Sequence, residues 1–303
     1  MKTFIKITLS LFLVLAIMGF SGVSWALDKK LVVGGKNFTE QYILPEMAKI
    51  LLEKQGFEVA LKTGVGSTVL RQAMENGEVD LCFEYTGSAY TLYLKQKDRA
   101  IMTDPEKVFH YVKEADAKKG LIWLYPSGLN NNYTLIMLKT QAQKLNISTV
   151  SDLAAFVKKK PKDLIFGVNE EFLIRPDGIK GLMRFYGFRV PTQNLKQMPT
   201  GLTCTALKEE KIQVTVGFAT DGRIAAFHFV NLKDDKKFFP AYNVAPVVRK
   251  KILDQYAEIR EILKPIMQLT TEEMRQLNKA VDVDKQSIHQ AARGWLTSHG
   301  FIF

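Results

Sequence analysis

Short apolar runs rich in Val, Ile and Leu alternate along the chain with segments whose apolar residues recur at helical spacing. The first cycles indicate strand Leu31–Val33, helix Tyr42–Leu51, strand Val59–Leu61, helix Val69–Met74 and strand Val79–Phe83. Repetition of strand, helix and strand is typical of largely parallel sheets covered by helices. The pattern therefore predicts an α/β protein with mixed, mostly parallel sheets flanked by helices.

The same alternation continues to the end of the chain. Further predicted strands are Leu121–Leu124, Thr134–Leu138, Leu164–Val168, Val214–Phe218 and Val244–Val248. Helix starts are indicated at Asp104–Pro105, at Ser148–Ser151 and at Thr270–Glu273. The last 50 residues are predicted to be helical. No internal repeat or linker divides the chain, so periodicity alone leaves open whether it forms one large sheet or two similar lobes.

The N-terminus has the pattern of an export signal. Lys2 and Lys6 precede an apolar run, 7–20, and Ser24 and Ala26 place small residues where a signal peptidase cleaves. A retained membrane anchor is disfavoured because the core of the run is shorter than the roughly 20 apolar residues that a span needs. No cysteine near Ala26 offers a lipid attachment site. We therefore expect a signal peptide over 1–26, cleavage near Ala26 and a soluble protein in a Gram-negative periplasm.

The charge balance is moderately basic. The chain has 42 basic and 31 acidic residues, a net charge of +11, of which the signal would remove two lysines. The densest clusters, Lys158–Lys162, Lys233–Lys237 and Arg249–Lys251, lie in polar turns or at helix ends. Scattered clusters of this kind favour a solvated surface over a nucleic-acid interface.

The residues that usually carry redox, metal or catalytic chemistry show no recognisable pattern. Cys82 and Cys204 are a single pair and are expected to be buried free thiols. The histidines have no metal-ligand spacing, and the serine, zinc and cysteine enzyme motifs are absent. A catalytic group assembled from distant parts of the chain would have only Glu40, Glu84 and Asp221 in the candidate strings. We predict no metal, no cofactor and no enzymatic activity.

Four aromatic residues lie where predicted strands meet loops: Tyr85, Tyr133, Phe218 and Tyr242. Taken singly, each is more often a core or rim residue. Open α/β sheets bind ligands at the carboxyl ends of their strands, so together these rings could enclose a cation by cation–π attraction.

Two basic residues accompany the aromatic ones. Arg175 follows the strand Leu164–Val168 and could hold a carboxylate through paired hydrogen bonds, although an ion pair with a neighbouring acid is equally compatible with the sequence. Lys36 follows the first strand and could add a second positive charge or simply be solvated. The glycine-rich stretch 64–68 lacks the Gly-Lys-Ser/Thr ending of a phosphate loop and is interpreted as a turn into a helix whose N-terminus faces the cleft.

Several strings together resemble the glycine betaine, choline and carnitine binding proteins of ABC importers. The strings are VGGKNFTEQ at 33–41, EYTG at 84–87, FATDGRI at 218–224 and FPAYNVAPVVR at 239–249. They occur in the order found in that family, and the resemblance runs from about Leu31 to the C-terminus. Several motifs with the right spacing are far more specific than any one string.

The resemblance implies a two-lobed, class II periplasmic binding fold. Lobe one would comprise 27–130 and 241–303, and lobe two 131–240. The aromatic cage of the family would correspond to Tyr85, Tyr133, Phe218 and Tyr242. Its carboxylate-binding positions would correspond to Lys36, Ser88 and Arg175, with Asn131 as a backbone contributor beside the methylated ammonium. The chain departs from the family pattern at Phe218, where a tyrosine is expected, and at Ser88, where threonine is common.

The implied function is capture of a small solute for import. The protein would be a periplasmic, monomeric binding protein that delivers glycine betaine or a related quaternary-ammonium compatible solute to an inner-membrane ABC permease and its ATPase. Choline, carnitine or an amino acid would be the alternative ligand. Closure of the two lobes would both trap the solute and signal to the permease.

Overall fold

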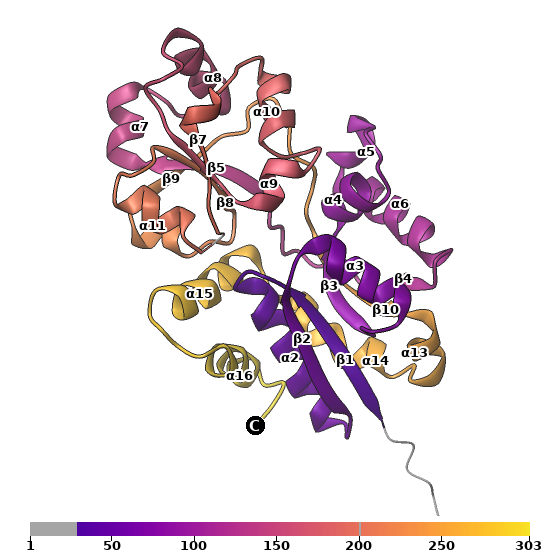
Figure 1. Ribbon diagram of the computed structural model, residues 1–303. Helices are drawn as coiled ribbons and strands as arrows, with labels where there is room; N and C mark the ends of the chain where they lie inside the picture. Colours follow the sequence, from indigo (N-terminus) through magenta and orange to yellow (C-terminus); the bar gives the residue numbers. More distant parts are fainter. Residues whose placement is uncertain (1–28, 200) are drawn as a thin grey trace, which may run out of the picture.

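The computed structural model of the protein describes residues 29–199 and 201–303. Within these residues, two five-stranded sheets flanked by helices form two lobes (Figure 1). No helix of the described part is long and apolar enough to cross a membrane. The predicted signal, 1–26, lies outside the described residues. We keep the lobe limits 27–130 with 241–303, and 131–240, as a proposal.

The sheet of lobe one has the strand order β2-β1-β3-β10-β4. Its strands are β1 (Lys30–Lys36), β2 (Glu58–Val65), β3 (Leu81–Tyr85), β4 (Leu121–Trp123) and β10 (Val244–Arg249). The helical segments between β1 and β4 are α2 (Glu40–Lys54), α3 (Ser67–Asn76), α4 (Thr86–Ser88), the π-helix η1 (Ala89–Tyr93), α5 (Arg99–Met102) and α6 (Pro105–Ala117). All five residues of β3, the central strand, are buried.

The sheet of lobe two has the order β7-β6-β8-β5-β9. Its strands are β5 (Tyr133–Leu138), β6 (Phe166–Val168), β7 (Leu195–Gln197), β8 (Val214–Phe218) and β9 (Phe229–Leu232). Its helices are α7 (Lys139–Leu145), α8 (Val150–Lys159), α9 (Glu170–Ile174), α10 (Ile179–Tyr186), the short 3₁₀ turn η2 (Thr192–Asn194), α11 (Thr203–Lys208) and α12 (Arg223–Ala226).

The C-terminal part of the chain returns to lobe one (Figure 1). It forms α13 (Lys250–Gln255), α14 (Ile259–Leu263), the 3₁₀ turn η3 (Lys264–Gln268), α15 (Thr271–Asp282) and α16 (Ile288–Ser298). Both α15 and α16 pack against α2. Their N-termini are closed by capping boxes, Thr270 with Glu273 and Ser287 with Gln290, which satisfy backbone N–H groups left free at a helix start. The predicted helical C-terminus is confirmed.

The other predicted helix starts are also confirmed. Asp104 caps α6 by accepting hydrogen bonds from two backbone N–H groups, and Pro105 occupies the first helical position. At α8, Thr149 and Asp152 form a capping box. The buried thiols of Cys82 and Cys204 are free, as expected.

The predicted mixed sheets flanked by helices are confirmed, but parallel strand pairs do not predominate in them. In each sheet of the described chain, two of the four neighbouring strand pairs are antiparallel: β10 opposes β3 and β4, and β5 opposes β8 and β9. Both β5 and β10 follow a link that contains no helix. Because β4 and β9, which precede them, belong to the other sheet, β5 and β10 each enter their sheet from the other lobe, and no helical crossover within that sheet makes them parallel to a neighbour. The short strands β7 and β9 were not predicted.

Candidate functional site

A cavity of about 770 Å³ lies between the two lobes, and all eight residues predicted for the ligand site line it. They are Lys36, Tyr85, Ser88, Asn131, Tyr133, Arg175, Phe218 and Tyr242. Lobe one supplies Lys36 at the end of β1, Tyr85 at the end of β3 and Ser88 in α4. The sheet edges thus bring to one place residues far apart in sequence.

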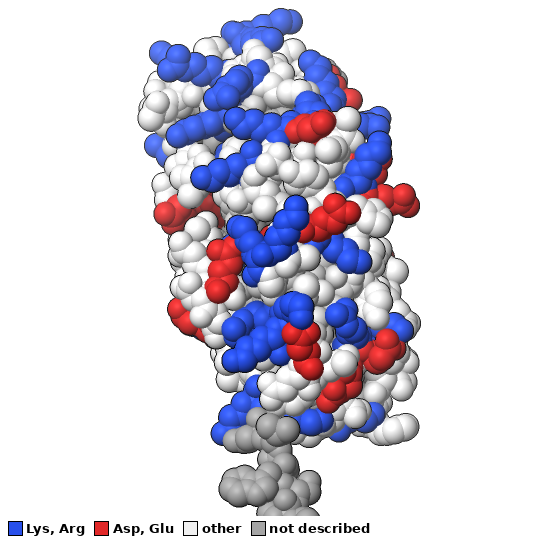
Figure 2. Space-filling view, turned by 90° about the vertical axis from the view of Figure 1, so that its right-hand side faces the viewer, with Lys and Arg blue, Asp and Glu red and all other residues white. Residues whose placement is uncertain are grey.

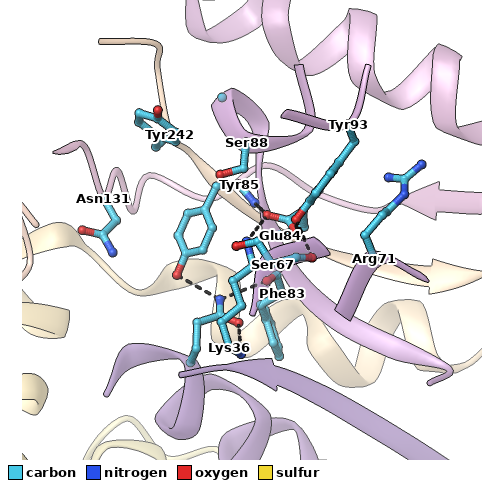
Figure 3. A network of polar contacts seen from close by, with 12 residues as sticks. Lys36, Ser67, Arg71, Phe83, Glu84, Tyr85, Ser88, Tyr93, Asn131 and Tyr242 are labelled. Atoms are coloured by element: carbon cyan, nitrogen blue, oxygen red, sulfur yellow. Dashed lines mark hydrogen bonds and ion pairs between the residues drawn. The ribbon is translucent and has the colours of Figure 1, made fainter. Parts of the chain in front are cut away.

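The lysine of the cavity wall is held by a buried carboxylate. Lys36 Nζ lies 2.6 Å from Glu84 Oε1, and its side chain is 2% exposed, so a solvated lysine is excluded. Glu84 also accepts hydrogen bonds from the backbone N–H of Tyr85, at 2.7 Å, and from the Tyr93 hydroxyl, at 3.0 Å (Figure 3). The Lys36 ammonium lies 5.0 Å from the ring centre of Tyr85. These contacts come from lobe one.

The arginine of the opposite wall is paired with two acids. Arg175 Nε and Nη2 each donate to Asp177 at 2.8 Å, and Nη1 donates to Glu171 Oε1 at 2.9 Å. Burial alone would raise the pKa of Asp177 and of Glu171, but the charge of Arg175 holds both below their usual values. The sequence left open an ion pair between Arg175 and a neighbouring acid. Arg175 does form such pairs, with Asp177 and Glu171, and its side chain is buried rather than on the surface.

Arg175 also reaches across the cavity. Its Nη1 lies 3.3 Å from Ser88 Oγ and its Nη2 lies 3.4 Å from the Tyr242 hydroxyl. Tyr242 donates a hydrogen bond to Asp177 as well. The contacts of Arg175 with Ser88 and Tyr242 are long for hydrogen bonds, and they join the two lobes.

The aromatic residues form a connected set around the cavity. The ring centres of Tyr133 and Phe218 are 5.1 Å apart, and Tyr133 meets Tyr242 edge to face at 5.5 Å. Phe38 stacks on Phe218 at 5.0 Å and lies 6.2 Å from Tyr85. Phe38 was not predicted for the site, although it lies in the motif after β1, two residues beyond Lys36. Rings in this arrangement can face a cation from several sides.

A polar network lies behind Tyr85. The Tyr85 hydroxyl donates to Glu40 Oε1 at 2.6 Å, and Asn131 Nδ2 donates to the same oxygen at 3.1 Å. Asn131 Oδ1 accepts from Thr220 at 2.9 Å, so the bond from Asn131 to Glu40 connects these two residues of lobe two to lobe one. Burial raises the pKa of Glu40, although these hydrogen bonds act in the opposite direction. Figure 3 shows Tyr85 lying between Lys36 and Asn131.

The glycine-rich stretch behaves as predicted. Within it, Gly66 is the N-cap of α3, and residues 66–69 line the cavity. Ser67 Oγ donates to Glu171 Oε1 at 2.7 Å, which adds a contact between the lobes. Glu171 also lines the cavity, where it was not predicted. Among the described residues, no cluster of His, Cys, Asp or Glu is arranged to hold a metal ion.

Comparison with known proteins gives this geometry its context. Residues 29–298 match the family model described as the substrate binding domain of ABC-type glycine betaine transport systems. The chain belongs to this family. The family is that of the substrate-binding component, so the resemblance found in the motif strings is confirmed.

Individual members of the family and related structures support the same assignment. The chain is 37% identical over 296 residues to the glycine-betaine-binding protein of Pseudomonas aeruginosa, covering 96% of this chain and 94% of that one. It is 32% identical to the carnitine transport binding protein OpuCC of Listeria monocytogenes, over 82% of this chain and 80% of OpuCC. A crystal structure of a glycine betaine/carnitine/choline ABC transporter protein superposes with a TM-score of 0.72 at 30% identity, covering 89% and 99% of the two chains. The two-lobed fold is confirmed.

Proposed function

We propose that this protein binds glycine betaine or a close quaternary-ammonium relative between its lobes and delivers it to an ABC permease. The observation that carries the proposal is the convergence of aromatic faces and two cationic side chains on one cavity. A betaine has a methylated ammonium at one end and a carboxylate at the other. The site offers a matching group to each end.

The aromatic set would hold the ammonium. Trimethylammonium spreads its charge over methyl groups and donates no ordinary hydrogen bond, so ring faces can replace water around it. Tyr85, Tyr133, Phe218 and Tyr242 supply these faces, and Phe38 extends the set through its stacking on Phe218. Because the faces come from both lobes, the cage is complete only when the lobes are together.

Arg175 would hold the carboxylate. Its contacts with Asp177 are short, at 2.8 Å, whereas those with Ser88 and Tyr242 are 3.3 and 3.4 Å. A ligand carboxylate can therefore replace the long contacts and leave the buried ion pair intact. Ser88 and Lys36 lie on the same cavity wall and would complete the carboxylate site.

Choline is the second candidate ligand, and one observation favours it. Each cation of the cavity is already paired: Lys36 with Glu84, and Arg175 with Asp177 and Glu171. These pairs reduce the positive charge that a carboxylate would meet, which favours a ligand with a quaternary ammonium and no carboxylate.

The remaining parts of the proposal concern the setting of the protein. The predicted signal and the family membership support an exported protein that acts in the periplasm. We propose that it acts as a monomer and has no enzymatic activity. Its partner would be the permease of the transporter, which would recognise the closed form.

Titration calorimetry on the mature protein tests the ligand assignment. Glycine betaine, proline betaine, carnitine and choline would be compared with an unmethylated amino acid such as glycine. We expect heat from at least one quaternary-ammonium compound and none from glycine. Tight binding of glycine with no response to the methylated compounds would overturn the proposal.

A further inference from the structure

The surface charge is distributed unequally between the two lobes. Among exposed residues of 131–240, fifteen are Lys or Arg and five are Asp or Glu. Among exposed residues in the rest of the described chain, fourteen are basic and twelve are acidic. Figure 2 shows blue side chains dominating the upper part of the molecule, which is lobe two, and blue mixed with red below. Nearly all the excess positive charge is therefore on lobe two.

The two lobes also differ in how their lysines are paired. On lobe one, six exposed lysines lie within ion-pair distance of a carboxylate: Lys30, Lys62, Lys107, Lys119, Lys250 and Lys264. On the described part of lobe two, only Lys160 and Lys211 do so. The other exposed lysines of lobe two thus have their charge available to an external anion.

Five of the exposed basic residues of lobe two lie on or next to α8 and α10. Lys158 and Lys162 are exposed at and beyond the end of α8, Lys180 and Arg184 are one helical turn apart on α10, and Arg189 follows α10. The two helices pack together, and the Lys158 ammonium lies beside Gly187, which ends α10. We name these five residues the lobe-two basic surface.

The composition of this surface points to one class of partner. Protein interfaces are built around buried aromatic and apolar anchors, and lysine is depleted from them. The large apolar residue nearest the basic surface, Phe185 on α10, is covered on one face by the Arg99 guanidinium at 4.4 Å. Several unpaired basic side chains without an apolar centre suit a broad, fluid layer of negative charge better than a shaped protein partner.

We propose that the lobe-two basic surface binds the headgroup layer of a bilayer that contains anionic phospholipids. Attraction to such a layer falls off within a Debye length, so it acts only near the membrane and weakens with salt. Because lobe one has nearly balanced surface charge, the bilayer would be approached by lobe two. The interaction is independent of the solute site, since none of the five residues lines the cavity between the lobes.

Co-sedimentation of the mature protein with vesicles tests the proposal. The probes are vesicles of phosphatidylcholine alone and vesicles of phosphatidylcholine mixed with phosphatidylglycerol, at low and at physiological salt. We expect binding only to the mixed vesicles, and less of it at the higher salt. No binding to the mixed vesicles at low salt would overturn the proposal.

Matched charge-reversal variants test whether vesicle binding depends on the lobe-two basic surface or only on the net charge of the protein. The lobe-two variant combines Lys158→Glu, Lys162→Glu and Arg184→Glu. The lobe-one variant combines Lys97→Glu, Lys118→Glu and Lys251→Glu, which are also exposed. We expect the lobe-two variant to lose about tenfold or more in vesicle affinity and the lobe-one variant to lose less than about twofold. Equal losses would overturn the proposal, because only total charge would then matter.

Two further measurements keep the result interpretable. Thermal unfolding and calorimetric ligand binding of both variants should match the unaltered protein, since the substitutions lie on the surface and outside the cavity. Soluble polyglutamate provides the alternative partner class. Binding to polyglutamate together with no binding to the mixed vesicles would replace the lipid assignment with an acidic protein partner.

Discussion

The two walls of the cavity hold their cationic side chains in different ways. On lobe one, Lys36 is paired with Glu84 of the neighbouring strand, and Glu84 is held in turn by Tyr85 and Tyr93. On lobe two, Arg175 pairs with Asp177 and Glu171 but also contacts Ser88 and Tyr242 of the opposite wall. The contacts that hold Lys36 form when its own lobe folds, whereas some contacts of Arg175 form only when the two lobes come together. Substitutions should therefore affect stability on one wall and ligand binding on the other.

The largest effect on stability is expected from Lys36→Met. The substitution leaves the Glu84 carboxylate buried without its cation, which typically costs about 3–5 kcal/mol of unfolding free energy. Urea denaturation without ligand measures it. Lys36→Met combined with Glu84→Gln should recover much of the loss, because the uncharged amide can still accept from the Tyr85 N–H through its oxygen and can donate to the Tyr93 hydroxyl through its NH2 group. Lys62→Met, from an exposed ion pair, should have little effect. A loss no larger for Lys36→Met than for Lys62→Met would contradict the buried-pair argument.

The largest effect on binding is expected from Arg175→Ala. Loss of a buried cation that meets the ligand carboxylate should weaken glycine betaine by about 2–5 kcal/mol. Choline should lose far less, because it has no carboxylate and the acids Asp177 and Glu171 remain. Calorimetry with both ligands gives the comparison, and Arg184→Ala, an exposed arginine of the same lobe, is the control. If glycine betaine and choline lose the same binding free energy, Arg175 does not bind the ligand carboxylate.

A smaller effect is expected at the cage. Phe218→Ala removes one ring face from the ammonium and should weaken a quaternary-ammonium ligand by about 0.5–2 kcal/mol. Phe218→Tyr keeps the face and should stay within about threefold of the unaltered protein. Phe185→Ala, which alters a ring outside the cavity, is the matched control. If Phe218→Ala and Phe185→Ala bind alike, Phe218 contributes no cation–π contact.

The smallest effect concerns the pH dependence of stability. The pKa of Glu40 is raised above 4.5 by burial, so folding favours its protonated form. Its stabilising contribution is complete below pH 4.5 and is lost as the pH rises through the raised pKa. Glu40→Gln cannot ionise but keeps an acceptor for Tyr85 and Asn131. Denaturation curves from pH 4.5 to neutral should therefore fall less steeply for Glu40→Gln than for the unaltered protein. Parallel curves would show that folding does not raise the pKa of Glu40.

Much of the fold followed from the alternation of apolar runs and helical periods. Most predicted strands coincide with observed strands. The helix starts at Asp104 and Thr270 were predicted correctly because the capping residues are neighbours in the sequence. The direction of the strands within each sheet was harder to predict from the sequence. The two strands that oppose their neighbours, β5 and β10, are each entered from the other lobe, and this long-range path of the chain is not visible in local periodicity. The three-residue strand β7 is too short to show a period.

The site was predicted unevenly, for a physical reason. The resemblance to the family selected eight residues that line one cavity, because several of them lie at strand ends that meet in space. The partners of those residues were mostly missed. Glu84 faces Lys36 from another strand, and Glu40 reaches Tyr85 from α2, so neither pairing is visible in local spacing. Phe38 was missed although it lies within the first motif string, because nothing in the local sequence shows that its ring stacks on Phe218.

The late return of the chain to lobe one affects how the protein can be made. Strand β10 is the partner that connects β4 to the rest of its sheet, and it ends at Arg249, with α13 to α16 still to follow. A chain that emerges N-terminus first therefore offers lobe two as a continuous stretch that can assemble early. The sheet of lobe one cannot be completed until β10 is available, because β10 lies between β3 and β4. Export in an unfolded form would suit this order, because the first lobe to begin is the last to be finished.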